Sequence, residues 1–148
     1  MNELDAQRLI CKSAVSGGGF AFKMSNRFLV GVPDLLVKIP QYPTMLIEVK
    51  LDKSKVKDPI DVEVTPTQGG YLRRARAAGM VTGVASFLQR TSRLCLCIVP
   101  TLPHFTGDSN HHSIYIDEYE VLDRDAGTRQ LQVRNWLSLL AITSGIGE

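Results

Sequence analysis

An apolar run after Asp34 and the sequence Ile47-Glu48-Val49-Lys50 lie on either side of a proline-containing turn in the first third of the chain. Side chains on a strand point alternately to its two faces, and the pattern predicts one strand within residues 28–39 and another over 44–51. The turn Pro40–Pro43 joins them into a hairpin. The positions expected to be buried on one face are Leu35, Val37, Ile39, Met45, Ile47, Val49 and Leu51.

Charged residues of this hairpin gather on the opposite face. A hairpin centred on Pro40–Pro43 places Asp34 nearly across from Glu48, a close approach at which cross-strand side chains interact. Glu48 and Lys50 are two residues apart and therefore point to one face. Two carboxylates and a lysine can assemble a magnesium site that cuts a phosphodiester bond. The alternative is a surface hairpin in which Glu48 and Lys50 merely pair with each other, which stabilises little.

The rest of the chain predicts an α/β fold. Helices are expected over residues 2–15, from Thr65 to about Ala78, and over 131–142. Strands are expected over 20–24, 81–87 and 93–99, with a weak one over 113–120. Residues 52–64 are charged without a clear period and predict a loop, as do residues 101–112 with their glycine and proline. We expect one domain, with residues 1–100 as its core and 101–148 as a C-terminal extension packed on it.

Composition narrows the class of protein without deciding its function. The chain has 148 residues, of which 44% are hydrophobic and 22% charged, as in ordinary globular proteins. The formal net charge of +2 does not by itself indicate a nucleic-acid partner. The three cysteines have no zinc-type spacing, and we expect them to be buried in a reducing compartment. No signal peptide or membrane span is recognised, so we expect the protein to work in the cytoplasm, that of the host if a phage encodes it.

Two further polar residues lie at the starts of the predicted helices. Asn2 is a good N-cap for the first helix, and Glu3 falls on the same helical face as its apolar residues, whereas Asp5 falls on the polar face. An acid aimed inward needs a partner or a metal ion. Thr65 and Gln68 fit a capping box, in which Gln68 bonds to the Thr65 amide. Gln68 is also placed to line a site, and the sequence leaves both roles open.

The predicted elements carry a series of motif residues in order along the chain: Glu3, Lys23, Gly31-Val32-Pro33-Asp34, Ile47-Glu48-Val49-Lys50, Thr65-Pro66-Thr67-Gln68 and Tyr71. This series resembles the PD-(D/E)XK nuclease superfamily and, within it, the VRR-NUC group of small phage and bacterial nucleases. The resemblance covers about residues 2–88, and residues 100–148 match no known pattern. It implies a restriction-endonuclease-like αβββαβ core, with a mixed central sheet flanked by helices.

The resemblance also implies roles for these residues in metal-dependent hydrolysis of DNA. Asp34 and Glu48 would bind Mg2+ or Mn2+ together with the main-chain carbonyl of Val49, and Glu3 would add a ligand directly or through water. Lys50 would orient or deprotonate the attacking water or hold the phosphate. Gln68 is similar to a glutamine that lines the site in related nucleases. The expected catalytic residues are thus Asp34, Glu48, Lys50, Gln68 and Glu3.

Contacts with DNA are expected from basic and aromatic residues near this site. A local basic surface on a near-neutral protein is one way to bind phosphates, although a solvated helix face explains the arginines equally well. The candidates are Lys23, Lys53, Tyr71, Arg73, Arg74 and Arg76.

Three functions compete on the sequence. The first is a structure-specific endonuclease of the Holliday-junction-resolvase kind, because several of the resembling nucleases resolve four-way junctions. Symmetric cutting implies a homodimer, for which the segment around Leu131, Trp136, Leu137 and Leu140 offers either an interface or packing on its own domain. The second is a monomeric nuclease acting on single strands, ends or replication intermediates. The third is a non-catalytic nucleic-acid-binding module.

Overall fold

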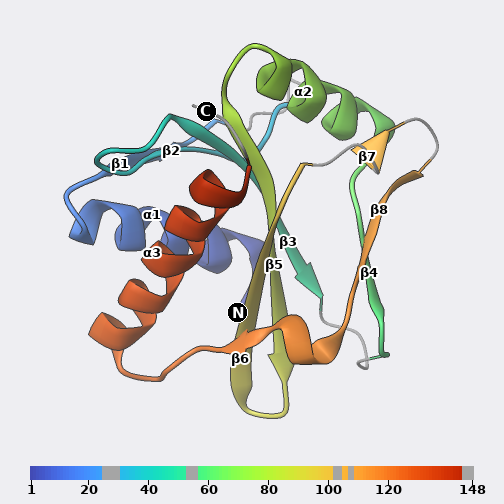
Figure 1. The fold of residues 1–148 in the computed structure, drawn as a ribbon. Coiled ribbons are helices and arrows are strands. Elements are labelled where there is room, and N and C mark those ends of the chain that lie inside the picture. Colours follow the sequence, from blue (N-terminus) through green and yellow to red (C-terminus); the bar gives the residue numbers. More distant parts are fainter. Residues whose placement is uncertain (25–30, 53–56, 102–104, 107–108, 145–148) are drawn as a thin grey trace.

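The computed structural model describes residues 1–24, 31–52, 57–101, 105–106 and 109–144. The elements follow the order α1 (Glu3–Ser16), β1 (Phe20–Lys23), β2 (Leu35–Lys38), β3 (Met45–Asp52), β4 (Ile60–Glu63), α2 (Pro66–Ala77), β5 (Val81–Arg90), β6 (Arg93–Pro100), β7 (Phe105–Thr106), β8 (Ser109–Ile114), the 3-10 helix η1 (Ile116–Glu118), β9 (Glu120–Val121) and α3 (Ala126–Thr143). A six-stranded sheet in the order β1-β2-β3-β5-β6-β9 forms the centre. Figure 1 shows α1 and α3 together on one side of it, and the small sheet β4-β8-β7 on the other.

The central sheet is mixed because its connections differ in length. β1 and β2 pair antiparallel, as do β2 and β3, and a short turn suffices to join β2 to β3. β3 and β5 pair parallel, and α2 lies on the connection between them, as parallel pairing requires. The hairpin register places Leu35 opposite Ile47, so that Asp34 is one step further along, opposite Glu48. The predicted hairpin geometry is confirmed.

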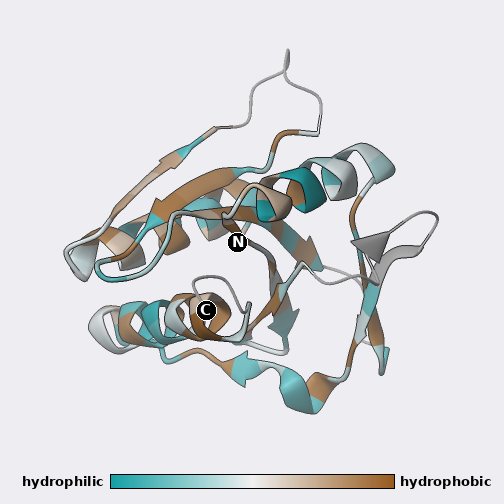
Figure 2. Cartoon of the chain, turned by 45° about the horizontal axis from the view of Figure 1, so that its top comes forward, coloured by the Kyte–Doolittle hydropathy of each residue, from teal (hydrophilic) through white to brown (hydrophobic). Residues whose placement is uncertain are grey.

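Two hydrophobic cores fill the two faces of this sheet. The first, between the sheet and the helices α1 and α3, takes the odd-numbered residues of β2 and β3, including Leu35, Met45, Ile47 and Val49. The second, beneath α2 and the small sheet, includes Leu72 of α2. Figure 2 shows the central strands as mostly hydrophobic and the helices as mixed. The predicted buried face of the hairpin is confirmed, with Leu51 only partly buried at its end.

Capping and one glycine set the local geometry around the hairpin and α2. Asn2 and Thr65 cap α1 and α2, each within a capping box. Gly31 has a φ of +82°, and a Cβ built on it would lie 2.3 Å from the side chain of Thr67. A glycine is therefore required where the segment leading to Asp34 crosses the first turn of α2.

The predictions for residues 52–64 and 101–120 were partly wrong. Residues 60–63 form the strand β4 rather than a loop, with Ile60 and Val62 buried and Asp61 and Glu63 exposed. The predicted surface loop over 101–112 contains β7 and most of β8, and β8 pairs with β4. The predicted weak strand over 113–120 contains the end of β8, η1 and the start of β9. β4 is short and half of its residues are charged, so its alternating pattern is hard to recognise in the sequence. The strand with which it pairs, β8, lies about fifty residues later in the chain.

The C-terminal helix α3 starts earlier than the sequence predicted, at an N-cap formed by Asp125. Leu137 and Leu140 are buried in the first core, whereas Leu131 is exposed. Gly83 of β5 provides the space for Leu140, since a Cβ there would lie 2.8 Å from it. Within the described part of the chain, neither α3 nor any other helix is long and apolar enough to cross a membrane.

Candidate active site

Asp34 lies just before the start of β2, and Glu48 lies opposite it in the middle of β3. The backbone N–H of Val49 donates to Asp34 Oδ2 over 2.9 Å, which ties the Asp34 carboxyl to β3. The Asp34 carbonyl in turn accepts the N–H of Met24 over 2.8 Å. Asp34 thus bridges the end of β1 and the middle of β3, and its carboxyl lies within hydrogen-bonding reach of the Glu48 carboxyl.

Glu48 is a buried acid in an unfavourable environment for its charge. Its side chain is 4% exposed, and no described group bonds to its Oε2 atom. Burial, a hydrogen bond with Asp34 and the negative charge of Asp34 raise the pKa of Glu48 from 4.5 to about 9, against the opposing effect of Lys50. A carboxyl perturbed by burial and a neighbouring acid in this way marks a candidate functional site.

Lys50 and Gln68 complete the cluster on the same face. Lys50 Nζ lies 3.9 Å from Glu48 Oε1 and donates to Gln68 Oε1 over 3.2 Å. Gln68 Nε2 donates to Glu48 Oε1 over 3.4 Å. Gln68 Oε1 also accepts the N–H of Thr65 over 2.9 Å, so this side chain forms the capping box and lines the cluster at once. The two roles that the sequence left open are therefore compatible.

Glu3 differs from expectation in its exposure. It was expected to face inward with the apolar residues of α1, but it is exposed in the first turn, ahead of the buried residue Ala6. Its charge nevertheless contributes to the raised pKa of Glu48. Glu3 therefore lies close enough to act on Glu48 electrostatically.

The cluster fits a hard divalent cation. A cation would satisfy the orphaned Oε2 of Glu48 and neutralise the repulsion between the Glu48 and Asp34 carboxylates. Among the residues that the structure describes, no group of three or more His, Cys, Asp or Glu side chains is placed to hold a metal ion. Mg2+ commonly binds proteins through one or two carboxylates and keeps several waters, which agrees with an acidic pair rather than a full cage.

A hollow of about 190 Å³ opens beside Lys50, between the central sheet and β4. Asp61 and Glu63 of β4 contribute to its wall together with Ser86 of β5. Sequence reasoning missed these residues because it assigned the segment to a loop. The sequence analysis also missed Gln7, which lies one turn beyond Glu3 on α1. Gln7 is 7% exposed, and its Oε1 atom has no hydrogen-bond partner among the described residues.

Several of the expected DNA-binding residues lie around this cluster. Lys23 is exposed at the end of β1 and pairs with Leu35, the residue after Asp34. The guanidinium of Arg74 lies 5.8 Å from the ring centre of Tyr71. Both side chains line a hollow of about 350 Å³ that includes Leu46, two residues before Glu48. Lys53 lies outside the described residues.

Arg73 and Arg76 lie on the same helix but in different surroundings. Arg73 is half-buried. Arg76 donates through Nη2 to the carbonyl of Ser144 over 3.0 Å and through Nη1 to the carbonyl of Thr101. These bonds join α2 to the end of α3 and to the residue after β6. They favour a structural role for Arg76 over contact with phosphate.

Comparisons with known proteins give a likeness at the level of structure. No protein-family profile and no curated protein matches the sequence. Among solved structures, the chain is similar to Archaeoglobus fulgidus Hjc, a Holliday junction resolvase from an archaeal hyperthermophile, with a TM-score of 0.54 and 16% sequence identity. The alignment covers 85% of this chain and 96% of that one. The likeness is one of fold. It confirms the expected restriction-endonuclease-like architecture, with a mixed sheet between helices.

Proposed function

We propose that this protein is a metal-dependent endonuclease that hydrolyses phosphodiester bonds in DNA, with branched DNA such as a four-way junction as its substrate. The observation that carries the proposal is the cluster of Asp34, Glu48, Lys50 and Gln68, in which a buried carboxyl with a raised pKa has an unsatisfied oxygen. The fold shared with a Holliday junction resolvase supports the choice of substrate. From its motif residues, we also propose that the chain is a PD-(D/E)XK nuclease of the VRR-NUC kind. This assignment goes further than the shared fold.

The residues of the cluster take distinct roles in this proposal. Asp34 and Glu48, with the main-chain carbonyl of Val49, would hold Mg2+ or Mn2+, and Glu3 would contribute from the solvent side through water. Such an ion supplies a water of lowered pKa and stabilises negative charge developing on the phosphate. Lys50 is placed to orient the attacking water or to hold a phosphate oxygen, since its Nζ is only partly exposed and lies beside Glu48.

Gln68 would act by positioning its neighbours. Its amide donates to Glu48 and accepts from Lys50, so one side chain sets the separation of the acid and the amine. Because the same oxygen caps α2, the helix start holds the amide in place. A rigid support of this kind keeps catalytic groups within the narrow geometric range that they need.

A homodimer follows from cutting two strands symmetrically, because each subunit carries one cluster. Leu137 and Leu140 pack within their own subunit, so they are not its interface. We further propose that the protein works in the cytoplasm, in keeping with its three free cysteines, two of them buried.

The second candidate is a nuclease acting on single strands or flaps as a monomer. It is favoured by Phe20 and Phe22 of the edge strand β1, which are 58% and 44% exposed and stack edge to face with ring centres 5.6 Å apart. Exposed aromatic rings are platforms on which unpaired bases stack. A non-catalytic binding module remains as the third candidate, although it leaves the strained Glu48 without a purpose.

One experiment separates these candidates. Labelled four-way junction, duplex, single-strand and flap DNA are incubated with the protein in Mg2+, Mn2+ or EDTA, and the oligomeric state is measured by light scattering. We expect paired cuts in the junction by a dimer, dependent on the divalent ion. Lys50→Ala should abolish cleavage, whereas the control Lys57→Ala, which removes an exposed lysine outside the cluster, should not. Cleavage of single strands by a monomer supports the second candidate, and binding without cleavage in any ion supports the third.

A further inference from the structure

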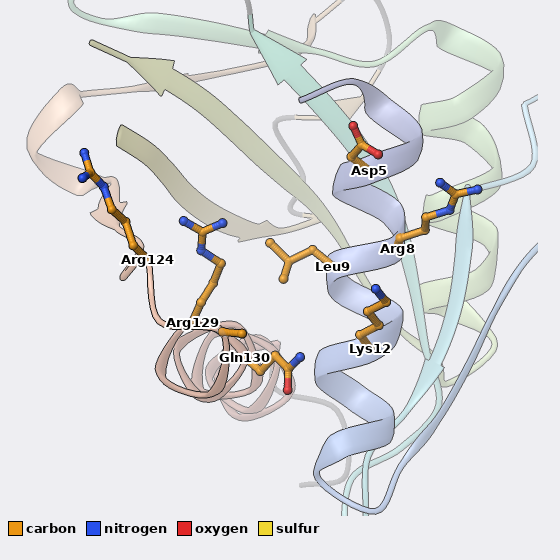
Figure 3. Close-up of a pocket in the computed structure, with 8 residues that line it drawn as sticks. Asp5, Arg8, Leu9, Lys12, Arg124, Arg129 and Gln130 are labelled. Carbon is orange, nitrogen blue, oxygen red and sulfur yellow. The ribbon is translucent and has the colours of Figure 1, made fainter. Parts of the chain in front are cut away.

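A second concave surface lies on the other side of the central sheet from Gln68. It is a hollow of about 380 Å³ between α1 and the start of α3. Arg8 and Lys12 of α1 and Arg124 and Arg129 of the α3 side line it, with Leu9 between the two helices (Figure 3). We call it the basic hollow. No residue of it was singled out as functional by the sequence.

Positive charge in the basic hollow is not balanced from within. Its lining has four cationic side chains and one carboxylate, that of Asp5. Asp5 Oδ2 accepts the N–H of Asn2 over 3.1 Å and so belongs to the capping box of α1. Among the described residues, none of the four cations forms an ion pair. Four cations against one carboxylate leave the lining with a net positive charge, which attracts anions.

The acids nearest in sequence to these arginines accept hydrogen bonds from the backbone and form no ion pair with the arginines, although they keep their own charge. Asp123 Oδ1 accepts the N–H of Asp125 over 2.8 Å, and Asp125 Oδ2 accepts the N–H of Thr128 over 2.9 Å at the start of α3. Arg124 and Arg129 bond instead to uncharged oxygens, the hydroxyl of Ser92 and the carbonyl of Asp123. Hydrogen bonds to neutral groups position the guanidinium groups without cancelling their charge.

Helix α1 begins near the candidate active site and runs past the basic hollow. Glu3, whose charge acts on Glu48, begins this helix, and Arg8 and Lys12 follow five and nine residues later. At 1.5 Å per residue they lie about 8 and 14 Å further along the axis. At about 100° per residue, Arg8 and Lys12 also lie about 140° and 180° around the helix from Glu3, so the basic hollow is a surface separate from the candidate active site.

We propose that the basic hollow binds the phosphodiester backbone of nucleic acid outside the candidate active site. The inference rests on the proposed function, to which it adds a second contact surface. Guanidinium groups match phosphate oxygens in a two-pronged geometry, and a lysine adds a point charge. Arg8 and Lys12 are four residues apart, and their spacing of about 6 Å along α1 suits a row of phosphates better than a single ion.

The test uses a pair of side chains that have no structural bonds. Arg8 and Lys12 are exposed and have no hydrogen-bond or ion-pair partner among the described residues, so the double variant Arg8→Gln/Lys12→Gln should fold as the wild type does. The matched control is Lys57→Gln/Arg90→Gln, which removes the same charge from two exposed positions outside the basic hollow. Both are compared with wild type by fluorescence anisotropy on a labelled four-way junction, in Ca2+ and over a series of NaCl concentrations.

We expect the Arg8/Lys12 variant to bind the junction about tenfold more weakly, and its plot of log affinity against log salt to be shallower by about 2, since each lost phosphate contact removes about 0.9 from the slope. The control should keep the wild-type slope. An unchanged slope in the Arg8/Lys12 variant, or an equal loss in the control, would overturn the proposal. Arg124→Gln/Arg129→Gln should reproduce the loss from the α3 side.

Competing anions form the other arms of the experiment. Two results together would overturn the proposal: inorganic phosphate raises the melting temperature of the wild type but not of the Arg8/Lys12 variant, and the two proteins bind DNA equally. The basic hollow would then be a site for free phosphate. If polyglutamate binds this protein as tightly as DNA does at equal salt, the partner of the basic hollow is an acidic protein. Wild-type protein that binds the junction without cutting it would refute the nuclease proposal and leave the slope test of the basic hollow unaffected.

Discussion

Replacing Glu48 by glutamine should stabilise the metal-free protein while removing its activity. The substitution keeps the size of the side chain and removes its charge. In the wild type, burial and Asp34 raise the pKa of Glu48 from 4.5 to about 9, so the folded protein without metal holds this carboxyl protonated at neutral pH. The unfolded chain ionises it. Folding therefore includes an unfavourable protonation that the variant Glu48→Gln does not need.

The size of the effect follows from the pKa shift. At pH 7.5 the protonation costs at most about 4 kcal/mol, because each pH unit above 4.5 contributes about 1.36 kcal/mol. The amide brings two N–H donors into a buried site, and one left without a partner costs about 1–3 kcal/mol. We expect a net gain of about 1–3 kcal/mol in the free energy of unfolding, or roughly 3–10 °C in melting temperature for a chain of this length.

The dependence on pH has a definite sign. A carboxyl whose pKa is raised on folding favours the folded state fully below pH 4.5, and this contribution is lost as pH rises toward about 9. In EDTA, the melting temperature of the wild type should therefore fall between pH 5.5 and pH 8.5 more steeply than that of Glu48→Gln. Mg2+ competes with the proton for Glu48, so its stabilising effect on the wild type should grow with pH and be lost in the variant.

The assay is thermal unfolding in EDTA and in Mg2+ across this pH range, with DNA cleavage measured on the same samples. Asp117→Asn, at an exposed carboxylate of η1 outside the cluster, is the control and should leave the pH profile of the wild type unchanged. A Glu48→Gln protein less stable than the wild type at pH 8.5 in EDTA, or one with the same pH profile, would refute the description of Glu48 as a strained acid awaiting a cation.

Further substitutions test the support of the site. Gln68→Ala and Thr65→Ala each break the capping box and should lower stability by about 1 kcal/mol in urea, but Gln68→Ala alone should also slow cleavage; equal rates in the two variants would contradict a positioning role for Gln68. Gly31→Ala should cost about 1–3 kcal/mol in the same assay, because φ is +82° and the methyl group meets Thr67; wild-type stability would show that the turn adjusts freely. Arg76→Gln should cost about 1–3 kcal/mol through its lost carbonyl contacts, and an unchanged urea midpoint would make them dispensable.

The central hairpin could be predicted because local rules determine it. Strand parity decides which face a residue occupies, and a short turn determines which residues are opposite each other. These two rules were enough to place Asp34 opposite Glu48, and Glu48 beside Lys50. The capping boxes at Asn2 and Thr65 were predictable for the same reason, since each involves residues three apart in sequence.

The small sheet was missed because its pairing is not local. β4 has buried Ile60 and Val62 between exposed acids, which is a strand pattern only when a partner is available. That partner, β8, lies about fifty residues further on, in a stretch that resembles a surface loop. As a result, the hollow beside Lys50 and the contribution of Asp61 and Glu63 to its wall were absent from the sequence interpretation.

By itself, the sequence determined which chemical groups this protein brings together and on which face of the sheet they lie, because alternation along a strand and the length of a turn are properties of neighbouring residues. The tertiary structure decided how those groups behave. Burial of Glu48 beneath α2, its contact with Gln68 and the exposure of Glu3 depend on how distant elements pack. The basic hollow likewise exists only because α1 and α3, more than a hundred residues apart, lie side by side. Desolvation and electrostatic potential arise from such packing, and no stretch of sequence contains them on its own.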